Sequence, residues 1–332
     1  MELITISGYA YPAIQDWILK SWLPDLTFLG NFSYGITTEG GIIDLADEKL
    51  TESARRAGVL PMMVLTPLDS SGAFNDRTAS EVLSDSQKRS KLVYNIKDIL
   101  QRKGLAGVDF DFEFIPAENR QDYVELLRQA KAELAPSGYY VTAALAPKIS
   151  DDQQGSLYEG IDYGQIGAVA DYVLVMTYEW GYTYGPPMAV SPINQVRKVL
   201  DYAVSVISRE KILMGMPNYG YDWALPFVRG ESRAEKLASE EAFWRAQYYN
   251  AEILYDQLSQ APFFTYFDPA GRKHVVWYED QRSIRAKMAL AEEYGLGGMG
   301  FWNIMDYNPA NSTVLNEMYQ VRKFPFTDAG IF

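Results

Sequence analysis

Short apolar, β-branched segments alternate along this chain with longer segments of helical periodicity. Such alternation is typical of βαβ units and of a parallel sheet. The segments predicted to be strands are 2–7, 26–33, 59–65, 105–113, 139–146, 171–178, 211–217 and 298–302. Helices are predicted near 13–22, 47–57, 86–102, 118–135, 161–169, 192–207, 281–294 and 312–322. Because a helix follows every strand, the pattern predicts an α/β fold in the form of a closed (β/α)8, or TIM, barrel.

One connection is much longer than the others. Residues 222–280 separate the seventh predicted strand from the helix before the eighth, whereas such connections usually have only a few residues. The segment contains a predicted helix near 239–258, followed by a predicted β-hairpin made of residues 263–267, 268–272 and 274–278. An insertion after a barrel strand lies at the carboxyl face, where active sites are built. We therefore expect a single barrel over 1–332 with a small α+β insertion subdomain at about 222–280, which forms one wall of a groove.

The fourth predicted strand carries a row of acidic side chains. In residues 107–113, Asp109, Asp111 and Glu113 share one face, and the apolar residues between them point the other way. Carboxylates about 6.6 Å apart repel one another and do not all stay ionised unless water or a ligand intervenes. This strand alone leaves two interpretations open. One is a solvated strand face, and the other is a catalytic acid of raised pKa beside a second carboxylate that orients a reacting group, as in glycoside hydrolysis.

Position in the barrel favours the catalytic interpretation. The row runs toward the carboxyl end of the fourth strand, with Glu113 outermost. Because barrel interiors are normally packed with branched apolar side chains, buried Asp109 and Asp111 would be unfavourable unless they share a proton or accept strong hydrogen bonds. The sixth strand ends near Tyr178, which would donate a hydrogen bond at the barrel mouth or simply cap the core. The eighth ends with Trp302, which would form an apolar floor for a pyranose ring or fill the core.

The composition argues against several classes of function. The net charge is −13, so the average surface repels nucleic acid and anionic membranes. The absence of cysteine excludes disulfides, thiolate metal sites and cysteine nucleophiles. The single histidine, His274, lies in a predicted hairpin strand, where we expect a structural or surface role. Aromatic residues make up 14% of the chain and suit sugar platforms as well as core.

The N-terminal sequence and the hydropathy bear on location. No apolar segment approaches the ~18 residues of a membrane span. The first residues lack the basic region of a signal peptide and begin directly with a predicted strand. Two alternatives therefore stay open: the chain acts where it is made, with a cytoplasmic start, or a targeting segment has been removed.

Residues 107–113 resemble the Asp-x-x-Asp-x-Asp-x-Glu signature of glycoside hydrolase family 18. Residues 176–178 and Trp302 are similar to that family's motifs in the sixth and eighth strands, and the resemblance covers nearly the whole chain. Within the family, the chain resembles the branch of spore cortex-lytic N-acetylglucosaminidases, which trim the peptidoglycan of germinating spores. The segments that carry this narrower resemblance are 176–193, 218–226 and 277–280.

The resemblance implies retaining hydrolysis assisted by the substrate, an exception to the usual two-carboxylate scheme. Glu113 would protonate the glycosidic oxygen. Asp111 would hold the 2-acetamido N–H of the substrate, whose carbonyl oxygen forms an oxazolinium ion, and Asp109 would share a proton with Asp111. Tyr178 would bind the acetamido oxygen, and Trp302 would stack under the sugar. No metal or cofactor is implied, and the further substrate-binding residues implied are Met176, Glu179, Trp180, Tyr219 and Tyr221.

The chain departs from the family pattern at two positions. Ala106 stands where the signature usually begins with Asp, so one remote acidic partner is missing. Glu179 stands where many chitinases have Asp, and its longer side chain is expected to reshape the subsite beside the scissile bond, which argues against plain chitin. Members of the branch often carry LysM wall-binding modules ahead of the barrel, and none is evident in this sequence.

The expected function is hydrolysis of β-linked N-acetylglucosamine bonds in spore-cortex-like peptidoglycan. We expect a monomer at the spore or the cell wall that binds a polysaccharide or oligosaccharide with 2-acetamido sugars, and neither nucleic acid nor membrane. A chitinase or chitooligosaccharide hydrolase is the first alternative. Two alternatives from other classes are a lectin-like barrel without activity, and a Mg²⁺ or Ca²⁺ site for phosphoryl transfer on the acidic row. Lectin-like members of the family typically lack the acid, whereas Glu113 is present.

Overall fold

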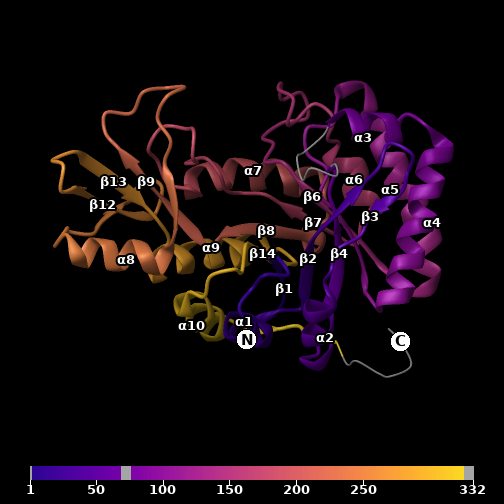
Figure 1. Ribbon diagram of the computed structural model, residues 1–332, viewed down its shortest axis with the longest axis horizontal. Coiled ribbons are helices and arrows are strands. Elements are labelled where there is room, and N and C mark those ends of the chain that lie inside the picture. Colours follow the sequence, from indigo (N-terminus) through magenta and orange to yellow (C-terminus); the bar gives the residue numbers. More distant parts are fainter. Residues whose placement is uncertain (1, 69–75, 325–332) are drawn as a thin grey trace.

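The computed structural model describes residues 2–68 and 76–324. Eight parallel strands close into a barrel, because β1 pairs with both β14 and β2 (Figure 1). In barrel order the strands are β1 (Glu2–Ala10), β2 (Phe28–Ile36), β4 (Leu60–Leu65), β5 (Gly107–Phe110), β6 (Tyr140–Leu145), β7 (Tyr172–Val175), β8 (Ile212–Pro217) and β14 (Gly298–Trp302). The predicted (β/α)8 barrel is confirmed.

Helices cover the outside of the barrel (Figure 1). They are α1 (Asp16–Trp22), α2 (Glu48–Arg56), α3 (Asp76–Leu83), α4 (Ser86–Lys103), α5 (Arg120–Leu134), α6 (Tyr163–Val169), α7 (Ile193–Val206), α9 (Gln281–Tyr294) and α10 (Pro309–Met318). Short 3-10 helices lie at η1 (Leu23–Asp25), η2 (Ala117–Asn119), η3 (Ala135–Ser137) and η4 (Arg209–Lys211). Neither α3 nor the two-residue strand β3 (Ile42–Ile43) was predicted from the sequence.

Local signals set where the longer helices begin and end. The carboxylate of Asp85 caps α4 by accepting hydrogen bonds from two backbone N–H groups, and α4 ends at Gly104, which has a φ of 65°. Asp280 forms a capping box with Ser283 at the start of α9, and Gly295 ends that helix with a φ of 63°. These caps satisfy N–H groups that have no intrahelical partner, and glycine adopts the left-handed conformation without a Cβ clash.

The last predicted helix is wrong at its C-terminal end. It does not continue to residue 322, because α10 ends at Met318 and the next residues form strand β15 (Tyr319–Val321). This strand pairs in parallel with the first residues of β1. The Tyr319 hydroxyl also donates a buried hydrogen bond to the Met288 carbonyl, 2.7 Å away. Strand pairing and the burial of Tyr319 therefore override the local helical pattern.

A second sheet, inserted between β8 and β14, lies beside the barrel (Figure 1). Its strands are antiparallel and follow the order β10-β9-β13-β12-β11. The elements are β9 (Tyr219–Ala224), β10 (Glu235–Ala238), α8 (Ser239–Tyr248), β11 (Leu254–Asp256), β12 (Ala261–Phe267) and β13 (Lys273–Trp277). Leu237, Phe264 and Val276 belong to an apolar core separate from that of the barrel. This sheet and α8 are called the insertion subdomain below.

The predicted hairpin is confirmed as β12 and β13. The predicted helix at 239–258 is wrong in its second half, since α8 ends at Tyr248. Asn250 takes a left-handed φ of 48°, which interrupts the helix, and Leu254–Asp256 then pairs with β12. The first strand of the second sheet, β9, begins at Tyr219, three residues before the predicted start of the subdomain. The extent of about 222–280 for the insertion subdomain stays a prediction.

The barrel interior is apolar at its base. Phe28, Leu60, Met62 and Ala106 form a buried cluster at or near the amino ends of their strands. An aspartate in place of Ala106 would bring a carboxylate into this layer, where an unpaired charge is unfavourable. Ala106, at which the chain departs from the family signature, therefore lies in the apolar base of the barrel, below Asp109, where the acidic row begins.

Strand β5 is shorter than predicted, since it ends at Phe110. The alternation of faces nevertheless continues, because the Asp111 N–H donates a hydrogen bond to the Leu65 carbonyl at 3.0 Å. Phe112 is buried in the outer core and stacks on Tyr123 at 5.6 Å between ring centroids. The apolar half of the row thus packs toward the helices, and the acidic half faces the interior and the mouth of the barrel.

Candidate active site

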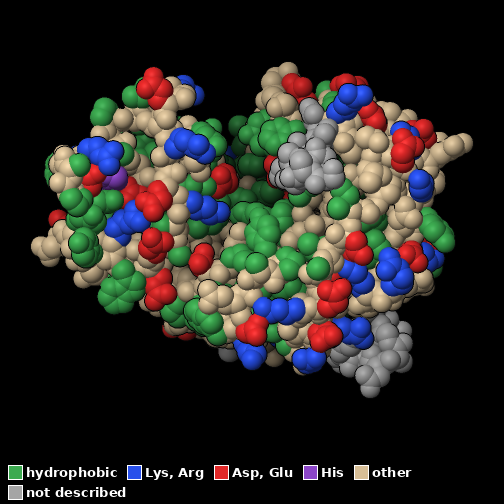
Figure 2. Space-filling view, in the orientation of Figure 1, with side chains coloured by type: hydrophobic (Ala, Val, Ile, Leu, Met, Phe, Trp, Pro, Cys, Tyr) green, Lys and Arg blue, Asp and Glu red, His purple; other side chains and the backbone are tan. Residues whose placement is uncertain are grey.

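A cavity of about 410 Å³ opens at the carboxyl ends of the barrel strands. Figure 2 shows a hollow between the insertion subdomain and the barrel, with hydrophobic side chains gathered on its floor. The predicted site residues that line the cavity are Asp111, Glu113, Met176, Tyr178, Glu179, Trp180, Tyr221 and Trp302. Two predicted residues do not line it: Asp109 lies deeper in the barrel, and Tyr219 lies behind Glu179.

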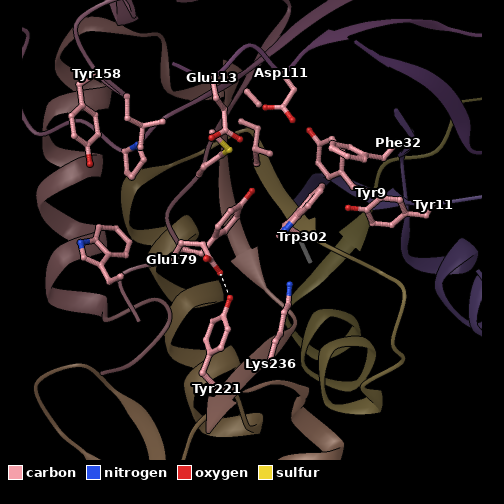
Figure 3. Close-up of a pocket in the computed structure, with 17 residues that line it drawn as sticks. Tyr9, Tyr11, Phe32, Asp111, Glu113, Tyr158, Glu179, Tyr221, Lys236 and Trp302 are labelled. Carbon is pink, nitrogen blue, oxygen red and sulfur yellow. Dashed lines mark hydrogen bonds between the residues drawn. The ribbon is translucent and has the colours of Figure 1, made fainter. Parts of the chain in front are cut away.

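Asp111 and Glu113 enter the cavity from the chain that follows β5 (Figure 3). Asp111 is only 6% exposed, and its Oδ1 has no hydrogen-bond partner among the described residues. Burial raises the pKa of Asp111 well above its usual value, and repulsion by Glu113 and Asp109 raises it further. Burial also raises the pKa of the half-buried Glu113, with a further contribution from Glu179. Because these carboxyls interact, they titrate as a pair, and burial favours a protonated form in that pair.

Asp109 lies below this pair, with 4% of its surface exposed. The Tyr9 hydroxyl donates to its Oδ2 at 2.9 Å, and the Thr142 hydroxyl donates to its Oδ1 at 2.5 Å. Burial raises the pKa of Asp109, and the two donated hydrogen bonds oppose this rise. No hydrogen bond joins Asp109 to Asp111 within the described residues. Proton sharing between them stays a prediction, because Asp109 is held by other partners.

Tyr178 follows β7 and is 8% exposed at the cavity wall. Its ring lies so close to β8 that a Cβ added to Gly215 would lie 2.7 Å from a ring carbon. Burial raises the pKa of Tyr178 well above its usual value, and the charges of Asp111 and Glu113 add to this rise. The phenol therefore keeps its proton and can donate a hydrogen bond into the cavity.

Trp302, the last residue of β14, forms an aromatic floor together with side chains from β1, from the residue that follows β1, and from β2 (Figure 3). Its ring centroid lies 4.8 Å from that of Phe32, 5.9 Å from Tyr9 and 6.3 Å from Tyr11. These edge and tilted contacts fix the indole orientation. A flat apolar surface is thereby held beside the carboxyl pair.

Glu179 occupies a left-handed backbone position, with a φ of 67°. Its Oε1 accepts hydrogen bonds from the Tyr219 hydroxyl at 2.5 Å and the Tyr221 hydroxyl at 2.9 Å. Tyr221 also lines the cavity, whereas Tyr219 is only 3% exposed. Tyr219 is therefore placed to hold Glu179 from behind, and substrate contact by Tyr219 stays a prediction.

Several cavity residues were missed from the sequence. Tyr9 and Tyr11 alternate at the end of β1, a spacing that would have indicated them had the strand been extended beyond residue 7. Phe32 lies in the middle of β2, near the end of the strand predicted at 26–33, and carries a similar signal. Lys236, on β10, carries no such signal, because the fold of the insertion subdomain alone brings it to the cavity.

Other candidate chemistry lies outside the cavity. His274 Nδ1 lies 2.7 Å from Asp222 Oδ1 inside the insertion subdomain, as expected of a structural histidine. Among the residues that the structure describes, no three His, Cys, Asp or Glu side chains are arranged to hold a metal ion. In residues 2–68 and 76–324, no helix is long and apolar enough to span a membrane.

Known proteins resemble this chain along most of its length. The family model "Glycosyl hydrolases family 18" matches residues 71–307. A cortical fragment-lytic enzyme of Bacillus subtilis (strain 168) is 39% identical over 303 residues, which make up 91% of this chain and 70% of that protein. The crystal structure of the Bacillus cereus spore cortex-lytic enzyme SleL matches with a TM-score of 0.93 at 37% identity, over 97% of this chain and 76% of that chain.

A chitinase structure from Chromobacterium violaceum shares the fold, with a TM-score of 0.87 at 23% identity over 95% of this chain and 98% of that chain. The family match extends over more than half of this chain. The barrel and its carboxyl-lined cavity are what such a match requires. This chain therefore belongs to glycoside hydrolase family 18 and is a glycosidase.

Proposed function

We propose that this glycosidase hydrolyses β-linked N-acetylglucosamine bonds in spore-cortex-like peptidoglycan, with retention of configuration. The observation that carries the proposal is the pair Asp111 and Glu113, both of raised pKa, beside the aromatic floor of Trp302. A carboxyl that holds its proton at a higher pH than usual suits a general acid. The indole face suits the apolar face of a pyranose ring.

In the proposed reaction, Glu113 gives its proton to the glycosidic oxygen as the bond from that oxygen to the anomeric carbon breaks. The acetamido carbonyl oxygen of the substrate forms the new bond on the opposite face, which yields an oxazolinium ion. Asp111 accepts a hydrogen bond from the acetamido N–H, and Tyr178 donates one to the acetamido oxygen. Water then opens the ion, and the ionised Glu113 takes its proton. Two inversions at the same carbon give net retention.

The relatives support cortex as the substrate, since the similar proteins are a cortical fragment-lytic enzyme and a spore cortex-lytic enzyme. We accordingly propose the spore as the site of action and an oligosaccharide or polysaccharide with 2-acetamido sugars as the partner of a monomer. Chitooligosaccharide hydrolysis is the second candidate, because it needs the same acetamido group. A lectin-like role is less well supported, because Glu113 is present beside Asp111.

The proposal is tested by treating purified spore cortex, vegetative peptidoglycan and chitooligosaccharides side by side and identifying the products by mass spectrometry. We expect cortex fragments with new N-acetylglucosamine reducing ends, and a rate that EDTA does not change. Equal cleavage of chitooligosaccharides would displace cortex as the preferred substrate. A rate abolished by EDTA and restored by Mg²⁺ or Ca²⁺ would instead favour metal-assisted chemistry.

The pH dependence of the reaction should respond to Glu179. A general acid works while protonated, so activity falls as the pH rises through the pKa of Glu113. The charge of Glu179 contributes to raising that pKa. Glu179→Gln removes the charge but keeps an acceptor for Tyr219 and Tyr221, so the alkaline limb of the pH profile of kcat/KM should move to lower pH.

Glu252→Gln, at an exposed position of the insertion subdomain, is the matched control and should leave the pH profile unchanged. If the alkaline limb of Glu179→Gln stayed at the pH of the unmodified protein, the expectation would be wrong.

A further inference from the structure

One positive charge stands in an otherwise acidic cavity. Lys236 lies on β10, the edge strand of the second sheet, where its backbone is paired with Tyr221. It is the only Lys or Arg among the described residues that line the cavity, whose other charged groups are Asp111, Glu113 and Glu179. Figure 3 shows its side chain reaching toward Trp302 from the side opposite Asp111 and Glu113.

The ammonium of Lys236 is held in place without a counter-ion. Its Nζ lies 3.8 Å from the centroid of the Tyr219 ring, which is itself fixed by its hydrogen bond to Glu179. Within the described residues, Lys236 makes no hydrogen bond or ion pair. The Lys236 residue as a whole is exposed, but partial removal of its ammonium group from water lowers its pKa, and the attraction of Glu179 and Asp306 opposes this only in part. A cation that is positioned, partly desolvated and unpaired can gain a partner when a ligand brings a negative charge.

We propose that Lys236 binds a carboxylate on the lactyl or peptide substituent of a sugar next to the 2-acetamido sugar at the cleavage subsite, and so selects acidic glycans over neutral ones. This inference rests on the proposed function. In peptidoglycan, N-acetylglucosamine alternates with a muramoyl sugar. Its lactyl group carries a carboxylate when it is free of peptide, continues as an amino acid or peptide that itself ends in a carboxylate, or is closed into a neutral lactam, whereas chitin carries no carboxyl. Because the protein has a net charge of −13 and the cavity holds three other carboxyls, an acidic glycan needs a local cation to offset repulsion.

The test compares two glycans of nearly the same shape. One is a peptide-free peptidoglycan tetrasaccharide with free lactyl carboxylates, and the other is its neutral methyl amide. In Lys236→Met, kcat/KM for the acidic glycan should fall at least tenfold more than for the methyl amide, mainly through KM. Lys236→Arg should keep most of the preference, because it keeps the charge. Lys273→Met, which removes an exposed charge from the same subdomain, is the matched control and should keep the preference of the unmodified protein.

The outcomes separate this inference from the proposed function. If Lys236→Met lowered kcat/KM equally for both glycans, the carboxylate role would be overturned. A lower kcat together with a shifted pH profile would also overturn it, because that result would indicate an effect on Glu113. If the unmodified protein cleaves both glycans and Lys236→Met leaves their ratio unchanged, the inference fails while the proposed function stands. Cleavage of chitooligosaccharides but of neither muramoyl glycan would overturn both the inference and the proposed function.

Calorimetry in a Glu113→Gln background gives a readout without turnover. Adding Lys236→Met should weaken binding of the acidic tetrasaccharide at least tenfold, and unchanged binding would overturn the inference.

Discussion

Replacing Glu113 by glutamine is expected to lower turnover by about 10²- to 10⁴-fold, the usual contribution of a general acid–base group. The amide keeps nearly the size of the carboxyl but has no proton to transfer to the glycosidic oxygen and cannot later accept one from water. Binding of the oligosaccharide should persist, because Trp302 and Tyr178 are unchanged. Steady-state hydrolysis of cortex fragments and calorimetric binding of the same fragments measure the two effects separately.

The control for this substitution is again Glu252→Gln, which also replaces one carboxylate by an amide but lies outside the cavity lining. It should retain full turnover, so that a change in total charge is separated from the loss of the acid. If Glu113→Gln hydrolysed cortex fragments at the rate of the unmodified protein, the assignment of the acid would be wrong. If Glu113→Gln lost both binding and turnover, the substitution would have damaged the cavity. Glu113→Asp, which keeps a carboxyl group, would test this explanation and should restore binding.

The second large effect concerns the substrate. A glycan with glucose in place of N-acetylglucosamine at the cleavage position has no internal nucleophile. A well-placed intramolecular group is equivalent to an effective concentration of about 10⁵ to 10⁸ M, so its removal should bring hydrolysis below detection. A chitooligosaccharide whose cleavage-site acetamido group is replaced by a hydroxyl, followed by chromatography of the products, measures this directly.

Asp111→Asn provides the matching change on the protein. The amide can no longer act as a charged acceptor for the acetamido N–H, so turnover of the N-acetylated substrate should fall by about 10²-fold or more, as for the loss of one electrostatic contact to a transition state. The glucose-containing substrate, which lacks that N–H, should stay uncleaved by both proteins. Measurable turnover of the glucose-containing substrate by the unmodified protein would rule out substrate assistance and favour a carboxylate nucleophile.

Much of the site follows from local rules. The alternation of side chains along a strand places Asp111 and Glu113 on one face, and the common polarity of parallel strands brings that face to the same end as Tyr178 and Trp302. These rules do not depend on where the strand ends, so the early termination of β5 at Phe110 left the prediction of the cavity-lining pair intact.

The remaining parts of the site depend on contacts between distant segments. Asp109 is held by Tyr9 and Thr142, which lie 100 and 33 positions away along the chain. Tyr219 lies behind Glu179 because β9 turns into the second sheet, and Lys236 reaches the cavity through the pairing of β10 with β9. Register and side-chain packing in an inserted sheet are set by three-dimensional neighbours, so propensity and periodicity do not predict them.

The pairing of β15 with the first residues of β1 has a consequence for attachment. It holds the start of β1 and the end of the last described strand side by side at the amino ends of the barrel strands. In barrels of this kind the catalytic cavity opens at the other end. A tether joined before β1 or after β15 would therefore depart from the closed end of the barrel, and a surface that immobilises the protein through either tether would leave the substrate groove facing the solution.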